Sequence, residues 1–460
     1  MRDPADWAQL TNTEPEFLLL EKQIHNREIS SYAQIPPEAF SWHGWDLIPG
    51  ERLFAMIRPF LIDQLGRARS SMPAIYGDRL AQVELVPLRS PSDWWQIPLL
   101  FKDDGPGPDT IKDFKRYPDP GPDSNKDQKR YPDPAPDMYK DTKANRRGFR
   151  PIAAQDPFAL KPQDPVASAS AVFGSGGSQG RQTPTFVTLA DRAREVQAWR
   201  RSLDYHGLGP GDTVLYTYNT THKGGQWMQE SLWEHGINVI LRRPEEGPEQ
   251  VLQNLRAYHA NALFTVQQPG GSLPRQEKAA GINLHSLLQA SLEDPKYRGI
   301  LLNDSTGSRQ IQFLFLGGFE IVPYALELIH EYLDDIPVAT MLGSSEAIPQ
   351  ACSTNPALTP GAHCHHNNLH LLAGPHYIEV VKPEGDRWVP VATGEEGWLV
   401  YTSWARDGTI WIRYAPGDLA TWTLDEGQCS CGIYTPVISN VHRADAQEQA
   451  DLFLHGCAAG

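Results

Sequence analysis

Cysteine is scarce in this sequence, long apolar runs are missing, and positive charge is outnumbered by negative charge. Five cysteines in 460 residues are too few for a disulfide-stabilised scaffold. No stretch of about 18 or more apolar residues is present to form a membrane-spanning helix. The net charge of −15 gives no general basic surface for nucleic acid or anionic lipid. Because the first residues also lack an apolar signal region, we expect a cytoplasmic protein that binds neither nucleic acid nor membrane.

The length allows two or three domains, and the composition changes along the chain. Residues 1–102 are rich in Trp and Leu and predict a helical N-terminal layer, with an apolar helical stripe at 51–65. Residues 103–150 are rich in Pro and Asp, and a motif at 115–123 recurs at 129–137. Such a segment buries too little apolar surface to offset its ordering entropy. It is interpreted as an inserted, mostly extended linker, with a Tyr/Pro docking motif as the alternative.

Helix and strand patterns alternate over residues 151–350. We expect helices at 187–203, 227–235, 248–259 and 323–334, and strands at 212–218, 238–241, 262–266, 312–316 and 337–342. This alternation predicts an α/β core with parallel sheets covered by crossover helices.

The pattern changes after this core. Short strand patterns at 377–381, 397–402 and 409–414 are separated by Gly, Asp and Pro turns. They predict a small β-barrel or sheet over 351–445, which a tail at 446–460 would follow.

A Gly/Ser-rich loop, Ser175-Gly-Gly-Ser-Gln-Gly-Arg181, separates a small apolar run from an amphipathic helix. Its glycines allow a ligand to approach the backbone closely. Its N–H groups and hydroxyls can donate to phosphate, and Arg181 adds a positive charge. The loop lacks the ending of a P-loop and the spacing of a dinucleotide fingerprint. A flexible turn is the alternative, because Gly and Ser dominate ordinary loops.

Several segments, taken in order, resemble the adenylate-forming superfamily, in particular its phenylacetate–coenzyme A ligase branch with the acyl-protein synthetase relatives. These segments are 97–102, 175–181, 209–212, 317–320, 343–346, 397–402, 413–418 and 429–432. The resemblance implies a large α/β adenylate-forming N-terminal domain. It also implies activation of a carboxylic acid, aryl or fatty, by ATP as an acyl adenylate, with transfer to coenzyme A or an acyl carrier protein. A homodimer is compatible with it.

The resemblance also implies roles for particular residues. Glu346 would hold Mg²⁺ and act in catalysis together with Arg181, and Asp418 would bind the ribose hydroxyls. The implied nucleotide-binding residues are Ser175, Gly176, Gly177, Ser178, Gly180, Gly317, Gly318, Glu320, Gly343, Ser344, Ser345, Asp418 and Arg443. Taken alone, Glu346 fits a helix-start carboxylate and Asp418 fits an ordinary turn residue.

Residues 219–227 resemble a segment that lines the acid pocket of the family. The expected substrate-binding residues are His222, Lys223, Gly224 and Trp227. A Trp at a helix start is more often part of a core, and His222 and Lys223 also fit solvated surface positions. Both alternatives stay open.

Cysteine and histidine in the last third of the chain predict a structural Zn²⁺ site. The expected ligands are Cys352, His370, Cys429 and Cys431. Three thiolates and an imidazole suit a closed tetrahedral site, and residues 369–379 resemble a family segment that carries a zinc-ligating His in some members. Rival ligands are His363, Cys364, His365 and His366. Free cysteines in a reducing compartment are the alternative.

Some features depart from the family pattern. Leu342 replaces a Tyr that stacks on adenine, Gly177 replaces a Thr, and Ile433 replaces an Arg. The family's mobile C-terminal lid domain, with its adenylation lysine, would begin at Asp445, yet the last lysine is Lys382. We therefore expect an acid–thiol ligase-like enzyme without this domain, whose lid function is supplied in trans. The alternative is a non-catalytic or repurposed nucleotide- or acyl-binding relative that acts as a regulatory subunit or an acyltransferase.

Overall fold

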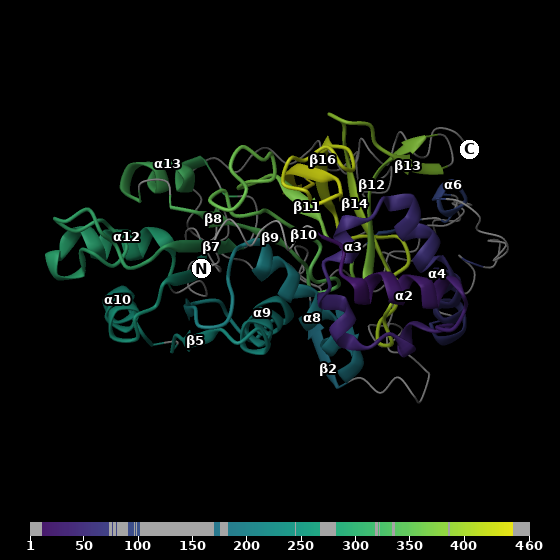
Figure 1. The fold of residues 1–460 in the computed structure, drawn as a ribbon, viewed down its shortest axis with the longest axis horizontal. Coiled ribbons are helices and arrows are strands. Elements are labelled where there is room, and N and C mark those ends of the chain that lie inside the picture. Colours follow the sequence, from purple (N-terminus) through teal and green to yellow (C-terminus); the bar gives the residue numbers. More distant parts are fainter. Residues whose placement is uncertain are drawn as a thin grey trace, which may run out of the picture.

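The computed structural model describes most of the chain outside the Pro/Asp-rich segment. The described residues are 12–72, 76, 80, 91–95, 97, 99–101, 170–174, 183–243, 245–266, 282–317, 321, 323–333, 336–384 and 387–444. They form a parallel sheet and a larger, mainly antiparallel sheet, with helices packed against both (Figure 1). Among these residues, none of the helices combines the length and apolar character needed to span a bilayer.

The N-terminal helices pack beside the antiparallel sheet, as the purple ribbons of Figure 1 show. They are α2 (Pro15–His25), η1 (Tyr32–Gln34), η2 (Pro37–Ser41), α3 (Gly44–Leu47), α4 (Gly50–Ser71) and α6 (Pro91–Trp94). Trp45 stacks on Phe40, and Phe60 stacks on Trp404 of the sheet region. These contacts place the N-terminal layer and residues near 404–414 in one buried core.

The five-stranded sheet has the order β5-β4-β6-β7-β8, and every neighbouring pair is parallel. Its strands are β4 (Thr213–Tyr216), β5 (Asn238–Leu241), β6 (Ala262–Val266), β7 (Phe313–Gly317) and β8 (Val338–Ala339). The helices between and beside them are α8 (Leu189–Tyr205), α9 (Lys223–Glu234), α10 (Pro248–Ala257), α12 (Leu284–Glu293), η6 (Pro295–Tyr297) and α13 (Pro323–Tyr332). The predicted α/β core with a parallel sheet is therefore confirmed.

Helix α8 begins at a capping box that also fixes a distant loop. The Thr188 hydroxyl accepts from the Asp191 N–H, and the Asp191 carboxylate accepts from the Thr188 N–H. The same carboxylate accepts from the N–H groups of Asp407 and Gly408 at 2.7 and 2.8 Å. A Cβ at Gly408 would overlap the main-chain oxygen of Phe186. Glycine is therefore required where this loop meets α8.

The second sheet has ten strands, and all its pairs are antiparallel except β1 with β15. Its main order is β1-β15-β14-β16-β17-β11-β10-β9, and β12 pairs with β13 and β14. The strands are β1 (Leu100–Phe101), β9 (Met341–Leu342), β10 (Ala351–Cys352), β11 (Leu369–Leu371), β12 (His376–Glu384), β13 (Arg387–Pro390), β14 (Glu396–Ser403), β15 (Tyr414–Ala415), β16 (Asp418–Leu424) and β17 (Val437–Arg443). A separate hairpin pairs β2 (Ala171–Gly174) with β3 (Pro184–Val187).

Two strand predictions differ from the structure. The stretch predicted as one strand at 337–342 is divided between β8 of the parallel sheet and β9 of the antiparallel sheet. The antiparallel sheet is consequently larger than the small β subdomain that we expected, because β1 and β9 also join it. In the stretch predicted as a strand at 409–414, only Tyr414 pairs in the sheet. The backbone turns at Arg413, which has a φ of 44°.

Arg413 joins the N-terminal layer to the antiparallel sheet. Its side chain is fully buried, and its Nε lies 3.2 Å from a carboxylate oxygen of Glu379 on β12. Nη1 donates to the main-chain oxygens of Trp95 and Ile97, and Nη2 donates to that of Trp388. Paired in this way, a buried guanidinium avoids most of the cost of an unsatisfied charge.

Candidate functional site

The structure describes the residues on either side of the predicted phosphate loop. Strand β2 ends before the loop, at Gly174, and strand β3 begins after it, at Pro184. The predicted residues Ser175, Gly176, Gly177, Ser178, Gly180, Arg181, Gly318 and Glu320 lie outside the described residues, as do Asp445 and the repeats within 103–150.

Glu346 lies in the loop that follows β9, and its side chain is buried with a relative exposure of 1%. The hydroxyl of Tyr414 donates to Glu346 Oε1 at 3.2 Å. A tight turn shapes the loop, because the Ser344 N–H donates to the Ala347 main-chain oxygen at 2.9 Å. The Ser344 hydroxyl lies 3.3 Å from the hydroxyl of Tyr401 on β14. Carboxylate and hydroxyl oxygens are thus gathered here, and hard cations such as Mg²⁺ prefer oxygen ligands.

Asp418 opens β16 and lies directly opposite Arg443 of β17. Arg443 Nη1 is 3.4 Å from Asp418 Oδ1. Burial raises the pKa of Tyr401 well above its ordinary value, and the negative charges of Glu346 and Asp418 raise it further. The two predicted acids, distant in sequence, lie in the same region of the antiparallel sheet, because Tyr414, which donates to Glu346, and the strand that Asp418 opens both pair with β14.

The other predicted nucleotide-binding residues differ in their burial and in their contacts. Gly343 is exposed and packs near Ile348, while Ser345 is half-buried. Gly317 ends β7, and its N–H donates to the hydroxyl of Tyr218. A Cβ at Gly317 would overlap that phenol. Tyr218, which no sequence motif indicated, occupies the space beside Gly317.

The predicted acid-pocket residues lie at the start of α9. His222 caps the helix, since its Nδ1 accepts from the Gly225 N–H at 3.1 Å. Gly224 lies beside this imidazole and Ile348. Trp227 is buried and meets Phe173 of β2 edge-on, with ring centroids 5.0 Å apart. Trp227 is therefore part of a hydrophobic core, which was the alternative to a role in the acid pocket.

Lys223 is not the solvated surface charge considered as an alternative, because it is fully buried. Its Nζ donates to Glu195 Oε1 of α8 at 2.8 Å, and the Trp227 indole donates to Glu195 Oε2 at 2.8 Å. His376 Nε2 and Arg406 Nη1 also approach Glu195 Oε1, at 3.3 and 3.4 Å. One carboxylate is thus surrounded by two cations, an imidazole and an indole.

The electrostatics of this group follow from its burial. Burial lowers the pKa of Lys223 to about 8, and the nearby guanidinium of Arg406 also lowers it. Burial lowers the pKa of His376 to about 4, so this imidazole is neutral at pH 7. Burial opposes ionisation of Glu195, but Lys223 and Arg406 hold its pKa below its usual range.

A second cluster gathers three thiols and one imidazole. Its members are Cys364, His370, Cys429 and Cys431, all buried, and their ligand atoms all lie within 4.8 Å of one another. The Nε2 atom of His370 faces the sulfurs, at 3.2 Å from that of Cys431. Its Nδ1 lies 2.7 Å from the Thr435 main-chain oxygen, which orients the ring. This donor set fits a tetrahedral Zn²⁺ site.

The electrostatics of the cluster favour negative charge on the sulfur of Cys429, whereas contacts with Cys364 and Cys429 raise the pKa of Cys431. Burial lowers the pKa of His370, but its contacts with the thiols of Cys364 and Cys429 outweigh burial and raise it to about 9. Contacts from the neighbouring thiols lower the pKa of Cys429. The two effects show that imidazole and thiolate stabilise each other's charged forms.

Cys352 is not a member of this cluster, so the predicted ligand set is corrected at this position. Cys352 lies on β10 opposite His370 of β11. Its burial raises its pKa well above the ordinary value, and the negative charge of Asp46 raises it further. Cys364, one of the rival ligands, comes from the loop before β11 and supplies the third sulfur.

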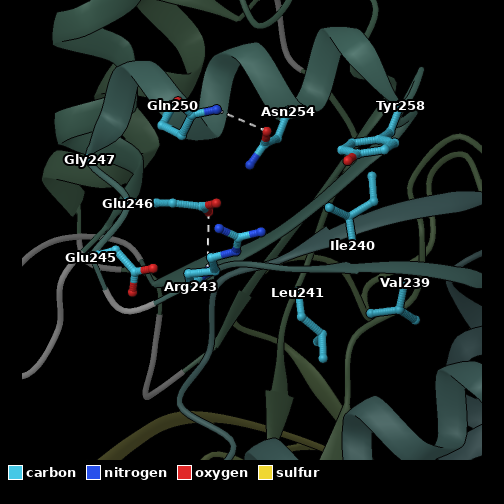
Figure 2. Close-up of a pocket in the computed structure, with 10 residues that line it drawn as sticks. All are labelled: Val239, Ile240, Leu241, Arg243, Glu245, Glu246, Gly247, Gln250, Asn254 and Tyr258. Carbon is cyan, nitrogen blue, oxygen red and sulfur yellow. Dashed lines mark hydrogen bonds between the residues drawn. The ribbon is translucent and has the colours of Figure 1, made fainter.

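A groove of about 770 Å³ lies elsewhere, between β5 and α10 (Figure 2). It is lined by Val239, Ile240, Leu241, Arg243, Glu245, Glu246, Gly247, Gln250, Asn254 and Tyr258. Figure 2 shows Ile240 and Tyr258 on the same side of the strand. None of the predicted site residues lines this groove, so it is distinct from the candidate site.

Known structures provide a comparison for this geometry. No sequence-family profile and no curated protein sequence matches the chain. Among solved structures, 2-hydroxyisobutyryl-CoA ligase is similar in an open conformation in complex with 2-HIB-AMP and CoA. It has a TM-score of 0.59 and 17% identity over 86% of this chain and 76% of that chain.

The same ligase is also similar in two other states. Its thioesterification state has a TM-score of 0.59 at 16% identity, over 88% of this chain and 71% of that one. Its postadenylation state with 2-HIB-AMP has a TM-score of 0.57 at 16% identity, over 86% and 68%. The chain therefore shares the fold of 2-hydroxyisobutyryl-CoA ligase at low sequence identity.

Proposed function

We propose that this protein activates a carboxylic acid, aryl or fatty, by attack on ATP to form an acyl adenylate. The acyl group is then transferred to coenzyme A or an acyl carrier protein. One observation carries the proposal: Glu346 and Asp418, distant in sequence, lie beside the same strand β14. Glu346 accepts from Tyr414, which pairs with Tyr401 of β14, and Asp418 opens β16, which also pairs with β14. Both acids lie within a fold shared with a ligase whose complexes hold an acyl adenylate and CoA.

The chemistry of the described residues supports this assignment. A carboxylate is a poor electrophile, and adenylation supplies a good leaving group. Charge that develops on phosphate must be stabilised by a metal ion and hydrogen-bond donors. Glu346 would hold Mg²⁺, and Tyr414 orients its carboxylate through a 3.2 Å hydrogen bond. Asp418 provides acceptors for ribose hydroxyls, and Arg443 holds this carboxylate from the facing strand.

ATP–pyrophosphate exchange with a panel of aryl and fatty acids tests the proposal. We expect exchange with at least one acid, and loss of about 100-fold or more in Glu346→Gln, because the charge stabilisation of the phosphoryl transition state is removed. Asp418→Asn should weaken ATP binding. Binding of nucleotide without exchange would favour a repurposed binding relative, and the absence of any nucleotide or acyl binding would refute the proposal.

We also propose that the Cys364, His370, Cys429 and Cys431 cluster holds a structural Zn²⁺ ion. The observation that carries this is the mutual proximity of three cysteine sulfurs and one imidazole nitrogen in a buried site. A tetrahedral Zn²⁺ site with Zn–S bonds of about 2.3 Å has sulfurs about 3.8 Å apart. The observed limit of 4.8 Å is close to this spacing. Four protein ligands leave no open position, so the ion would support the fold rather than the reaction.

A further inference from the structure

Arg406 links the buried group around Glu195 to the main chain of Glu346. Its side chain is fully buried. The Nη1 atom donates to the Glu346 main-chain oxygen and lies 3.4 Å from Glu195 Oε1. Nε and Nη2 have no hydrogen-bond partner among the residues that the structure describes.

This arrangement is poor for stability alone. A buried guanidinium with unsatisfied donors keeps much of its desolvation cost. Lys223 and Arg406 also share the single carboxylate of Glu195, and His376, which approaches the same oxygen, is neutral. Replacing a buried ionic group by apolar residues often leaves a protein equally stable or more stable. The arginine therefore needs an explanation other than its contribution to folding.

The contacts of Glu346 supply that explanation. Its main-chain oxygen is held by Arg406, and its carboxylate accepts from Tyr414. The backbone between Ser344 and Ala347 is closed by the 2.9 Å hydrogen bond of the turn. Arg406 is in turn fixed by Glu195 of α8, and by the loop that Asp191 anchors at residues 407 and 408. Arg406 thus connects Glu346 to helix α8 through direct contacts.

We propose that Arg406 is a positioning residue for the metal–nucleotide site, which it serves by holding the main chain of Glu346, whose carboxylate would hold Mg²⁺. The inference rests on the proposed function and extends it, because neither Arg406 nor Glu195 is a predicted contact of nucleotide or acid. Outer residues that orient a metal ligand commonly change metal affinity or activity by about 10–100-fold when replaced.

The test measures metal–nucleotide binding directly, without turnover. Mn²⁺ replaces Mg²⁺, and its binding in the presence of ATP is followed by electron paramagnetic resonance in wild type, Arg406→Met and Arg406→Lys. We expect binding to weaken about 10-fold in Arg406→Met. The lysine variant keeps the charge but cannot reproduce the planar fork, so it should be intermediate. It also carries the test if the methionine variant does not fold.

A matched control separates positioning from general loss of stability. Arg201 is equally buried, pairs with Asp46 at 3.2 Å and donates to the Ala373 main-chain oxygen. Arg201→Lys should lower the melting temperature while leaving Mn²⁺·ATP affinity within about twofold of wild type. An equal loss of affinity in both variants would assign Arg406 a merely structural role and overturn the proposal.

A double-mutant cycle tests whether Arg406 acts through Glu346. In a Glu346→Gln background, Arg406→Met should cause no further loss of Mn²⁺·ATP affinity. Additive losses, or a folded Arg406→Met protein with wild-type affinity, would refute the positioning role. Wild-type protein that does not bind Mn²⁺·ATP would instead refute the proposed function, and this inference with it. The two failures are therefore distinguishable.

Discussion

Replacement of Cys364 or Cys352 by Ser distinguishes the ligand set in the structure from the one expected from sequence. We predict that purified wild-type protein carries about one Zn²⁺ per chain. Cys364→Ser should lose nearly all of it, because a hydroxyl is a poor ligand for Zn²⁺ beside two thiolates. Cys352→Ser should keep it, because Cys352 lies outside the group of four.

The spacing of the four ligand atoms indicates how much Zn²⁺ would stabilise the fold. The four ligand atoms already lie within 4.8 Å of one another, so binding requires movements of only about 1 Å. A preformed site of this type releases much of the binding free energy as folding free energy, which reaches about 10–16 kcal/mol in small zinc-finger peptides. This chain has large apolar cores of its own, so we expect a smaller share of the binding free energy to appear as stability here.

Metal content by plasma mass spectrometry and melting by calorimetry measure both effects. Cys364→Ser should melt several degrees below wild type. Removal of Zn²⁺ by a chelator should lower the melting temperature of wild type toward that of the variant. Cys352→Ser leaves a hydroxyl in a core position and should cost about 1–2 kcal/mol without loss of metal. Loss of Zn²⁺ from Cys352→Ser together with its retention in Cys364→Ser would refute the assignment.

Three further predictions concern the candidate site, the pH dependence of stability and the backbone. Glu346→Gln should lower ATP–pyrophosphate exchange by about 100-fold or more while leaving the melting temperature within a few degrees of wild type; a large fall in stability would show a structural role instead. The pKa of His43 is raised to about 9, since its bonds to Asp204 and Glu14 outweigh burial. Stability from His43 is therefore complete below pH 6.5 and declines as pH rises toward 9, by about 3 kcal/mol at most. Denaturation between pH 6.5 and 8 should show this slope in wild type and not in His43→Gln. Gly408→Ala should destabilise strongly, because its Cβ would overlap a main-chain oxygen. Gly66→Ala in α4, with open space at Cβ, should instead stabilise by about 0.5–1 kcal/mol; equal effects of the two substitutions would contradict this reasoning.

Local patterns predicted the parallel sheet well, because each of its strands is a short apolar run bounded by turns or helices. The boundaries of β5 and β6 agree with the sequence prediction. The antiparallel sheet was harder, since its pairings join distant segments. Nothing near Leu100 in sequence indicates that it pairs with Tyr414. The division of 337–342 between two sheets is likewise a property of packing and not of local sequence.

In the candidate site, too, local sequence did not reveal which distant residues would come together. Three of the four cluster members were expected, but spacing along the chain cannot tell whether Cys352 or Cys364 folds toward His370. Sequence also gave no sign that Lys223 would be buried, because its partner Glu195 comes from another helix. A lysine followed by two glycines and a Trp can lie either on the surface or in a buried ion pair. Lys223 takes the buried position because Glu195 supplies a buried carboxylate for it.

The hydrogen bonds by which Arg413 joins the N-terminal layer to the antiparallel sheet have a consequence for biosynthesis. Its acceptors at Trp95 and Ile97 leave the ribosome more than 300 residues before the guanidinium that binds them. At translation rates of about 5–20 residues per second, this delay is roughly 15–60 s. Throughout that interval the apolar face of the N-terminal helices has no sheet to cover it, because Trp404, Trp411 and Tyr414 are also made late. During its synthesis the chain therefore exposes apolar surface that is covered in the finished fold, which favours aggregation of incomplete chains.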